Sequence, residues 1–418
     1  MADKGVSLYN DDDKTKGYPM TKELERFIRY VKIDTQSDDK SGSTPSAAKE
    51  LNLSRELVKE LGEMGIGATL DEYGRVYAKL VGEKDLPAIG LNSHVDTALE
   101  VSGANVKANY IPSYDGGLIK MKDGYSMSPA DFPRLANYKG SGLVVTDGTT
   151  LLGGDDKAGV AIIMATLDHY ASHPEEKHHT ICVLFTPDEE IGRGPEHFDK
   201  KKFGADFAYT IDGADPDLVE NENFNAAHAD VEFAGVAIHP GEAKGKMVNA
   251  LRLAAEFDGL LDPSERPELT AGYEGFNHPL QMEGTAEHAS VRYLIRNHDA
   301  AVFAKQKREF VDATKEMNRR HPRAHVKVTI ADDYRNMKEV FDRDPRAIKH
   351  ADEVYEKLGI KARHEPIRGG TDGATFSFLG CPTPNLGTGS YNHHGRFEYL
   401  SEKDFETMIG IVIALVRA

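Results

Sequence analysis

Apolar positions along the first half of the chain fall alternately into helical and strand-like spacings. Leu24, Phe27, Ile28 and Val31 share one helical face, which predicts a helix over residues 22–34. Further helices are expected at residues 47–64 and 160–170. Short apolar runs predict strands at residues 77–81, 88–93, 180–186 and 207–211. The run ICVLF is apolar throughout, as a parallel strand covered on both faces should be. The alternation therefore predicts an α/β fold.

The pattern changes after about residue 223. Residues 226–239 alternate like an antiparallel strand, and helices and strands follow at residues 248–261, 289–295, 300–319 and 326–331. From about residue 345 the α/β character returns, with a helix over 347–358 and a terminal helix from Glu402. We therefore expect one α/β domain, with a mixed, largely parallel sheet flanked by helices, that is interrupted by a smaller α+β domain.

These patterns set the expected domain boundaries. Residues 1–19 form a polar leader, either native or added to the protein artificially, which we leave out of the fold. Residues 20–223 and 333–418 are expected to form the two parts of the α/β domain. Residues 224–332 are expected to form the inserted domain.

Composition narrows the classes of function. The 51 Lys and Arg residues against 68 Asp and Glu give a net charge of −17, which argues against binding to nucleic acids or to anionic membranes. No apolar run is long enough to predict a membrane span. Two cysteines, Cys182 and Cys381, exclude a disulfide scaffold and a Cys-rich zinc module. Because the leader has no apolar signal core, we expect a cytoplasmic protein.

Five short segments place acidic or imidazole groups at matching points of the α/β pattern, four of them just after apolar strands or at a helix start. Their chemistry-bearing residues are His94 and Asp96, Asp155 and Asp156, Glu189 and Glu190, Asp212, and His393 and His394. In an open α/β sheet, ligands bind outside the carboxyl ends of the strands, so these groups are expected to converge on one site.

Convergence of this many carboxylates favours a metal site. Carboxylates held close together repel one another and take up protons, and a divalent cation removes that penalty. Two imidazoles with three or more carboxylates suit a pair of zinc, cobalt or manganese ions better than magnesium or calcium. Each segment alone has an ordinary explanation, such as a helix N-cap at Asp155–Asp156 or a polar surface loop at His393–His394. The five together favour the metal site.

Long ordered motifs, from about Met20 to the C-terminus, resemble the M20 family of dinuclear zinc peptidases, and in particular its tripeptide aminopeptidases. The motifs are NSHVDT, TLLGGDDKAGVA, FTPDEEIGRGPEHFD, YTIDG, ENFNAA, HPGEAKGKMVNAL, GYEGF, PIRGGTDGA and YNHHGRFE. The resemblance implies a zinc-exopeptidase-like catalytic domain in residues 20–223 and 333–418. It also implies that residues 224–332 form the lid domain of the family.

The resemblance also implies the metal ligands. His94, Asp155 and Asp212 would hold one zinc ion, and Asp155, Glu190 and His394 the other, with Asp155 as the bridge between two zinc ions per subunit. The family has a string like YHGKHE where this chain has HHGRFE. We choose His394 because it keeps the four-residue spacing to the following glutamate, and His393 is left as a bystander or a rival ligand.

Three further residues receive catalytic roles from the resemblance. Asp96 would hydrogen-bond His94 and fix its tautomer, and Glu189 would be the general base. His239, in the inserted domain, would stabilise the oxyanion that forms on the substrate carbonyl, with a surface loop as the alternative. The peptide bond between Asp155 and Asp156 is expected to be cis.

Substrate-binding residues are expected among three polar side chains. Arg296 and Arg368 are candidate clamps for a substrate carboxylate, because a guanidinium group matches a carboxylate in two hydrogen bonds. A structural ion pair is the alternative for each arginine. Asn249 either binds substrate or caps the helix that follows it.

The resemblance therefore predicts a zinc-dependent aminopeptidase that releases the N-terminal residue of tripeptides. The alternatives are another M20 activity, namely a dipeptidase, a carboxypeptidase or an N-acyl amino acid deacylase, and a catalytically silent binding protein. The expected partner is a small peptide. The preference for the N-terminal residue, the metal used in the cell and the oligomeric state stay open. A homodimer is one alternative, and His239 could then act in its own chain or in a second copy.

Overall fold

The computed structural model describes residues 6–7 and 20–418 of the chain. Most of the predicted leader, residues 1–19, lies outside the described residues. The contacts divide the chain into two units, which are described one at a time. Unit 1 comprises Met1–Asn221, Val340–Glu365 and Thr371–Ala418, and unit 2 comprises Glu222–Glu339 and Pro366–Gly370.

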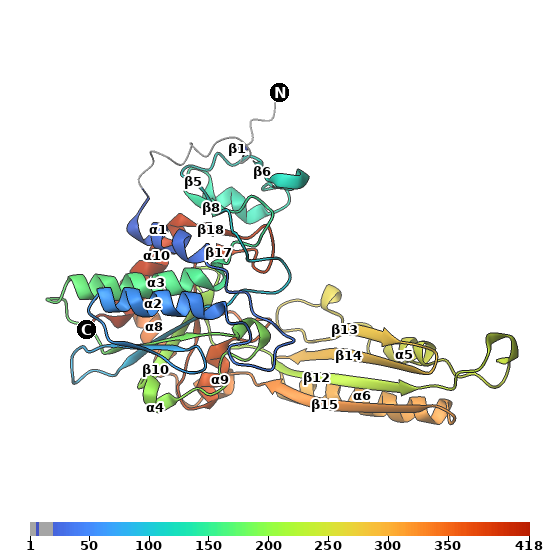
Figure 1. Cartoon of the computed structure of the whole chain (residues 1–418). Helices are drawn as coiled ribbons and strands as arrows, with labels where there is room; N and C mark the ends of the chain where they lie inside the picture. Colours follow the sequence, from blue (N-terminus) through green and yellow to red (C-terminus); the bar gives the residue numbers. More distant parts are fainter. Residues whose placement is uncertain (1–5, 8–19) are drawn as a thin grey trace. The chain divides into compact units, whose positions relative to one another are not determined.

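A seven-stranded sheet, which includes β10, forms the centre of unit 1 (Figure 1). Its strand order is β11-β16-β10-β4-β9-β3-β2. The four strands β16, β10, β4 and β9 run parallel, and β11, β3 and β2 add antiparallel edges. The bounds are β2 (Ala68–Leu70), β3 (Val76–Leu80), β4 (Ile89–His94), β9 (Ile181–Thr186), β10 (Phe207–Gly213), β11 (Val219–Glu220) and β16 (Asn385–Gly387). The expected mixed, largely parallel sheet is confirmed.

Helices cover both faces of this sheet (Figure 1). On one face lies α3, which packs on β4 and β10 and is itself packed against α1 and α10. On the other face, Phe203 of α4 and Phe376 of α9 pack on Leu184 and Ala208 of the sheet. The helices of this unit are α1 (Lys22–Val31), α2 (Glu50–Glu63), α3 (Gly154–Ser172), α4 (Lys200–Phe203), α8 (Arg346–Lys357), α9 (Asp372–Phe378) and α10 (Glu402–Val416). Burial of both faces explains the apolar runs of β4 and β9.

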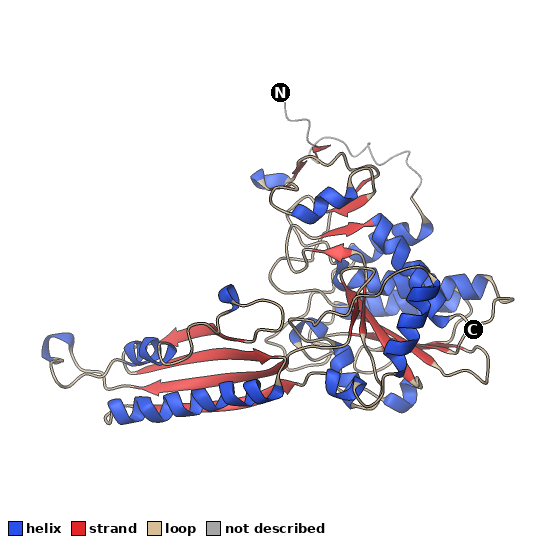
Figure 2. Ribbon diagram, turned by 180° about the vertical axis from the view of Figure 1, so that it is seen from behind, coloured by secondary structure: helices blue, strands red, loops and turns tan. Residues whose placement is uncertain are grey.

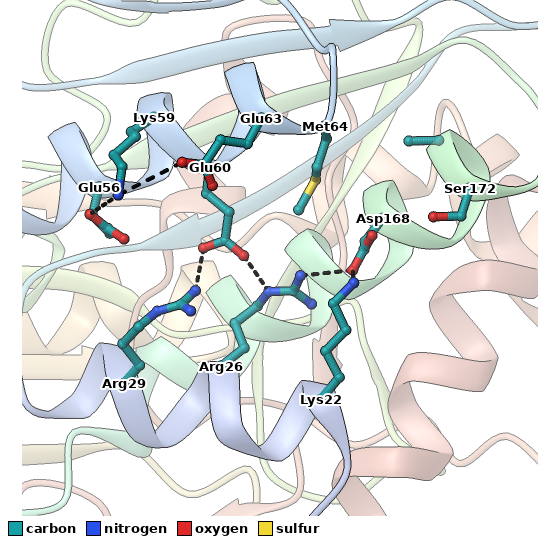
Figure 3. A pocket seen from close by; sticks show the side chains of 11 residues that line it. Lys22, Arg26, Arg29, Glu56, Lys59, Glu60, Glu63, Met64, Asp168 and Ser172 are labelled. Carbon is teal, nitrogen blue, oxygen red and sulfur yellow. Dashed lines mark hydrogen bonds and ion pairs between the residues drawn. The ribbon is translucent and has the colours of Figure 1, made fainter.

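Buried ion pairs join the first three helices of unit 1 (Figure 3). The guanidinium group of Arg26 on α1 donates to Glu60 of α2 at 2.7 Å and to Asp168 of α3 at 2.8 Å. Arg29 and Tyr30 also donate to Glu60. The charged members of this network line a groove in which acidic and basic side chains neutralise one another. The network is therefore part of the helix packing of the unit.

Two small sheets accompany the central one and were not predicted from the sequence. One has the order β17-β18-β8-β5 and the other β1-β6-β7. Their bounds are β1 (Val6–Ser7), β5 (Asn109–Ile111), β6 (Ile119–Lys120), β7 (Ser126–Met127), β8 (Leu143–Val145), β17 (Ser390–Tyr391) and β18 (Tyr399–Ser401). Strands of two or three residues are too short to show a periodic pattern. Tyr391 and Tyr399 pack with Tyr138 in a shared core.

Unit 2 is a four-stranded antiparallel sheet with two helices (Figure 2). Its strand order is β13-β14-β12-β15. The bounds are β12 (Asn225–Ala234), β13 (Phe276–Gly284), β14 (His288–Asn297), β15 (His325–Tyr334), α5 (Ala250–Asp258) and α6 (Ala300–Arg320). Phe257 of α5 and Phe310 of α6 pack with Val231 and Tyr293 of the sheet in one core. The helices thus cover one face, which explains the alternating pattern of the strands.

Unit 2 includes the segment 224–332 that the pattern suggested, together with residues on either side and a distant strap. β15 continues to Tyr334, and α7 (Lys338–Phe341) follows where the chain leaves the unit. The strap, Pro366–Gly370, joins the unit because His298 bonds to the carbonyl oxygen of Ile367. Among the described residues, no helix is both long and apolar enough to cross a membrane.

Candidate metal centre and active site

The end of β4 supplies the first imidazole of the site. His94 is buried, and its Nδ1 lies 3.3 Å from the Asp96 carboxylate and 3.2 Å from the Asp96 carbonyl oxygen. Its Nε2 lies 2.9 Å from Asp155 and 3.5 Å from Asp212. Asp96 therefore orients the ring through Nδ1, and Nε2 faces the carboxylates of Asp155 and Asp212. This is the arrangement of a metal-binding histidine whose second nitrogen is fixed by a carboxylate.

The start of α3 supplies two carboxylates with different surroundings. The Asp155–Asp156 peptide bond is cis, as the resemblance implied. One oxygen of Asp155 faces His94 and the other lies 3.2 Å from Nε2 of His394. Asp156 is buried and accepts the backbone N–H groups of His94 and Gly159. Asp155 is thus placed between the two imidazoles, whereas Asp156 holds the backbone.

The turn after β9 carries the two adjacent glutamates. The backbone N–H groups of Glu189 and Glu190 donate to the two oxygens of Asp96, at 3.0 and 3.1 Å. Before them, Asp188 has a left-handed backbone with φ of 61°. Oε2 of Glu190 lies 3.1 Å from Nε2 of His394. The Asp96 carboxylate therefore orients both the His94 ring and the turn of the two glutamates.

Asp212 and the histidine loop complete the cluster. Asp212 lies near the end of β10, which is hydrogen-bonded directly to β4. His393 and His394 lie between β17 and β18, and His394 has φ of 63°. Nδ1 of His393 lies 3.6 Å from Asp155, whereas His394 approaches both Asp155 and Glu190 more closely. These contacts favour His394 as the ligand, and His393 stays a rival.

The residues fit a site for divalent cations. Burial and then the charge of Asp155 raise the pKa of Glu190 to about 7, and they also raise the pKa of Asp212. Oε1 of Glu190 is buried without a hydrogen-bond partner. Buried, mutually repelling carboxylates beside two imidazoles are the donor set that a pair of borderline metal ions takes. A cation would neutralise the repulsion and satisfy the unpaired oxygen.

Within residues 6–7 and 20–418, two groups of three side chains bring their donor atoms within 4.8 Å of one another. They are His94, Asp156 and Asp212, and His94, Asp155 and Glu190. These groups differ from the ligand sets implied by the resemblance, in which Asp155 is shared and His394 takes part. Because the oxygens of Asp156 accept backbone N–H groups, we favour Asp155 over Asp156. The division of ligands between two ions stays a prediction.

Two further carboxylates beside the site had no role in the sequence analysis. Glu398 is buried and accepts the backbone N–H groups of Leu152, Gly153 and Asp155, at 2.7 to 2.9 Å. It therefore holds the segment that presents Asp155. Glu100 is exposed and lies 3.5 Å from Nδ1 of His394. For Glu398, the only signal in the sequence was its position in HHGRFE, four residues after His394.

The candidate oxyanion and helix-cap residues lie in unit 2. His239 is exposed, and its Nδ1 accepts the backbone N–H of Gly241. Oδ1 of Asn249 accepts the backbone N–H of Leu251 and caps α5. For Asn249 this contact favours the capping alternative. The role of His239 stays a prediction.

The two candidate arginine clamps also have partners inside unit 2. Arg296 donates to the carbonyl oxygen of Ala227 and lies 3.4 Å from Asp333. Arg368 donates to two carbonyl oxygens and to the hydroxyl of Thr270, and its guanidinium group lies over the ring of Phe224. These contacts favour the structural alternative for both. Their binding of a substrate carboxylate stays a prediction.

Comparison with known proteins connects this site to one enzyme family. The model of peptidase family M20/M25/M40 matches residues 146–418. Peptidase T of Clostridium perfringens is 46% identical over 401 residues, which cover 95% of this chain and 99% of that protein. Peptidase T of Shouchella clausii is 47% identical over 397 residues, 94% of this chain and 97% of that protein.

Solved structures share the fold. A tripeptidase from Staphylococcus aureus has a TM-score of 0.77 at 21% identity and covers 94% of this chain and 96% of its own. The aminopeptidase PepT from Bacillus cereus has a TM-score of 0.72 at 20% identity, covering 94% and 97%. The YXEP protein of Bacillus subtilis, described as a dinuclear metal-binding peptidase of family M20, has a TM-score of 0.62 at 13% identity, covering 94% and 96%. The chain belongs to peptidase family M20/M25/M40 and is a relative of the proteins named Peptidase T.

Proposed function

We propose that this protein is a metal-dependent aminopeptidase that releases the N-terminal residue of tripeptides. Two observations support the proposal. The side chains of His94, Asp155, Glu190 and His394 lie close together. The chain also matches Peptidase T of Clostridium perfringens over 95% of its length. Short peptides are the partner that this activity requires.

The metal ligands that we propose are the five residues named by the resemblance. They are His94, Asp155, Glu190, Asp212 and His394, with two zinc ions per subunit as the cofactor. The description of a structural neighbour as a dinuclear peptidase supports the number of ions, and the two imidazoles support zinc over magnesium. When bound, such ions polarise a carbonyl group and lower the pKa of water.

Glu189 is the general base of the proposal. It lies in the turn that Asp96 holds through two backbone hydrogen bonds, and among the described residues its carboxylate forms no hydrogen bond or ion pair. One of its oxygens takes the proton of the attacking water and gives it to the nitrogen of the leaving amine. The carbon–nitrogen bond of the substrate breaks as that nitrogen becomes protonated.

Residues of unit 2 complete the proposal. His239 donates a hydrogen bond to the oxyanion of the substrate, and Arg296 and Arg368 bind the carboxylate of the peptide. His239 lies beyond the end of β12 in unit 2, and the next experiment tests whether it acts in its own chain or in a second copy.

Mixing two inactive variants tests that homodimer. If His239 acts in the second copy, a mixture of His239→Ala and Glu189→Gln regains activity, because each mixed dimer contains one complete site. If His239 acts in its own chain, the mixture stays inactive. The control is each variant mixed with itself under the same conditions.

Hydrolysis of defined peptides tests the reaction. Chelator-stripped protein, with and without added zinc, is given Ala-Ala-Ala, Ala-Ala and N-acetyl-Ala-Ala-Ala. We expect zinc-dependent release of alanine from the N-terminus of Ala-Ala-Ala alone, and a loss of ~10²–10⁴-fold in Glu189→Gln. Cleavage of the blocked peptide would contradict an aminopeptidase. Preference for Ala-Ala would indicate a dipeptidase instead.

A further inference from the structure

Three successive backbone N–H groups in the turn that carries the proposed base all donate to carboxylates. Those of Glu189 and Glu190 donate to Asp96. The one before them, the N–H of Asp188, donates to Oε2 of Glu50 at 3.1 Å. Glu50 lies on α2, far away in the sequence, and no motif pointed to it.

Glu50 is part of a closed ring of hydrogen bonds behind that turn. Its Oε1 accepts the backbone N–H of Ala47 at 2.8 Å and the hydroxyl of Ser46 at 3.1 Å. The backbone N–H of Ser46 in turn donates to both oxygens of Asp188, at 2.9 Å. Glu50 and Asp188 are completely buried. The start of α2 and the turn after β9 are thus joined through two carboxyl groups.

The burial of Glu50 is unfavourable by itself. Among the described residues, no lysine, arginine or histidine forms an ion pair with Glu50, and a buried carboxyl group without such a partner costs free energy. Asp188 is also unfavourable, because its φ of 61° lies in the left-handed region that residues with a Cβ rarely adopt. Such a backbone persists only where its surroundings hold it. Glu50 bonds to the N–H of that very residue.

We propose that Glu50 is a positioning residue that fixes the turn Asp188–Glu190 and thereby aims the carboxylate of Glu189 at the substrate. This inference rests on the proposed role of Glu189 as the base. Glu50 itself does not touch the substrate or the metal ligands. Its removal should therefore affect the chemical step more than substrate binding.

A purely structural role would give a different result, and the same helix offers a matched control. Glu60 is another largely buried glutamate of α2, and it pairs with Arg26 and Arg29 away from the site. Glu60→Ala should lower stability without changing kcat of the folded protein. Glu50→Gln keeps the size of the side chain but turns one of its two accepting oxygens into an NH₂ group, so it should recover only part of the function lost in Glu50→Ala.

The test measures kcat, KM, bound zinc and unfolding by urea for wild type, Glu50→Ala, Glu50→Gln and Glu60→Ala. We expect Glu50→Ala to lose kcat by ~10- to 100-fold, because small misplacements of a catalytic group have effects of this size. KM and zinc content should stay at wild-type values, and Glu50→Gln should lose less kcat than Glu50→Ala. A Glu50→Ala protein with wild-type kcat, or with a loss that Glu60→Ala shares, would overturn the proposal.

Hydrogen exchange separates this inference from the proposed function. In the full chain, Glu50→Ala should speed amide exchange of the segment around Asp188–Glu190, and Glu60→Ala should leave that segment unchanged. If the wild type cleaved no tripeptide, the proposed function would fail, and exchange would still decide whether Glu50 holds the turn. Unchanged exchange in Glu50→Ala would overturn the positioning role.

Discussion

At the scale of single residues, Asp96 contacts three functional residues, Glu189, Glu190 and His94. It is completely buried, and its two oxygens accept the N–H groups of Glu189 and Glu190 while one of them faces Nδ1 of His94. One carboxylate thus sets the orientation of an imidazole and of a turn. A side chain that orients a metal ligand in this way is nearly as important as the ligand itself.

Replacing this carboxylate by an amide should weaken both functions. In Asp96→Asn one oxygen becomes an NH₂ group, which cannot accept the backbone N–H that it faces. We expect a ~10- to 100-fold loss of zinc affinity or of kcat/KM for Ala-Ala-Ala. Zinc titration and steady-state kinetics measure the two effects.

Asp199→Asn is a suitable control for this change. Its carboxylate also accepts two backbone N–H groups, those of Lys201 and Lys202, at the start of α4. Asparagine is an equally good helix cap, so this variant should match the wild type. Equal behaviour of Asp96→Asn and Asp199→Asn would contradict the role of Asp96.

At the scale of elements, the packing of α1, α2 and α3 depends on buried charge. Arg26 has only 3% of its surface exposed, and it contacts Glu60 and Asp168 on the two neighbouring helices. Burial works against these ions, and their hydrogen bonds compensate it only when every partner is present. The network therefore fixes the arrangement of the three helices more than it adds to stability.

Removing one member of this network should be destabilising. Arg26→Met removes one partner from Glu60, which keeps Arg29 and Tyr30, and one from Asp168, which keeps Lys22, and we expect a loss of ~1–3 kcal/mol in the free energy of unfolding. Urea unfolding followed by circular dichroism measures it. Lys59→Met, which removes exposed ion pairs on α2, should change the free energy by less than ~1 kcal/mol. Equal effects of the two variants would contradict a buried network.

The packing of α8 on β10 predicts a dependence of stability on pH. Burial, and then the positive charges of His179 and Lys357, lower the pKa of His350 to about 4. Its Nδ1 lies 2.8 Å from the hydroxyl of Tyr209, which donates to the carbonyl oxygen of Ala347. The unfolded chain binds a proton at this residue below pH ~6.5, whereas the folded protein does so only near pH 4. Stability from this group is therefore present above pH ~6.5 and lost as pH falls.

Comparison of two pH values checks this effect. From pH 7.5 to pH 5, the free energy of unfolding should fall in both proteins. We expect the fall to be ~1–2 kcal/mol smaller in His350→Gln than in the wild type. His364→Gln, which changes an exposed histidine, should follow the wild-type curve. An identical pH dependence of wild type and His350→Gln would show that His350 is protonated equally in both states.

At the scale of the whole molecule, all five proposed ligands belong to unit 1, although residues 222–339 separate two of its parts in the sequence. The cluster joins β4, α3, the turn after β9, β10 and the loop before β18. A ligand that binds only the folded state of a protein stabilises that state by mass action. Because the cluster does not exist in the unfolded chain, cation binding should stabilise this one.

Thermal unfolding measures that stabilisation without an activity assay. Zinc at ~100 times its Kd should add ~2.7 kcal/mol and raise the Tm of chelator-stripped protein by ~3 °C. Magnesium should have a smaller effect, because it prefers oxygen ligands. The variant His94→Ala/His394→Ala should lose the shift. An equal shift in that variant would place the bound zinc elsewhere.

The sequence determined the local structure and the identity of the reactive groups. Periodic runs located α1, β4, β9 and α6 within a few residues, because side-chain period depends on the local backbone. The longer motifs indicated the family, and they contain the residues that we propose as metal ligands. The starts of β4 and α10 also followed from the pattern. Elements of two or three residues, such as β17, and the short helix α9 were not predicted, because they contain too few residues to show a period.

The tertiary structure decided how those groups face one another. Asp155 faces the imidazole of His94, whereas the adjacent Asp156 accepts backbone N–H groups. This difference depends on contacts between segments that are distant in the sequence. The same holds for Glu50 and Glu398, whose hydrogen bonds reach residues more than a hundred positions away. Such pairs have no local signal, because hydrogen bonds depend on distance and direction in space. The sequence alone thus determined which residues could do the chemistry. Only the fold decided which side chains face the proposed metal site and which ones orient them through hydrogen bonds.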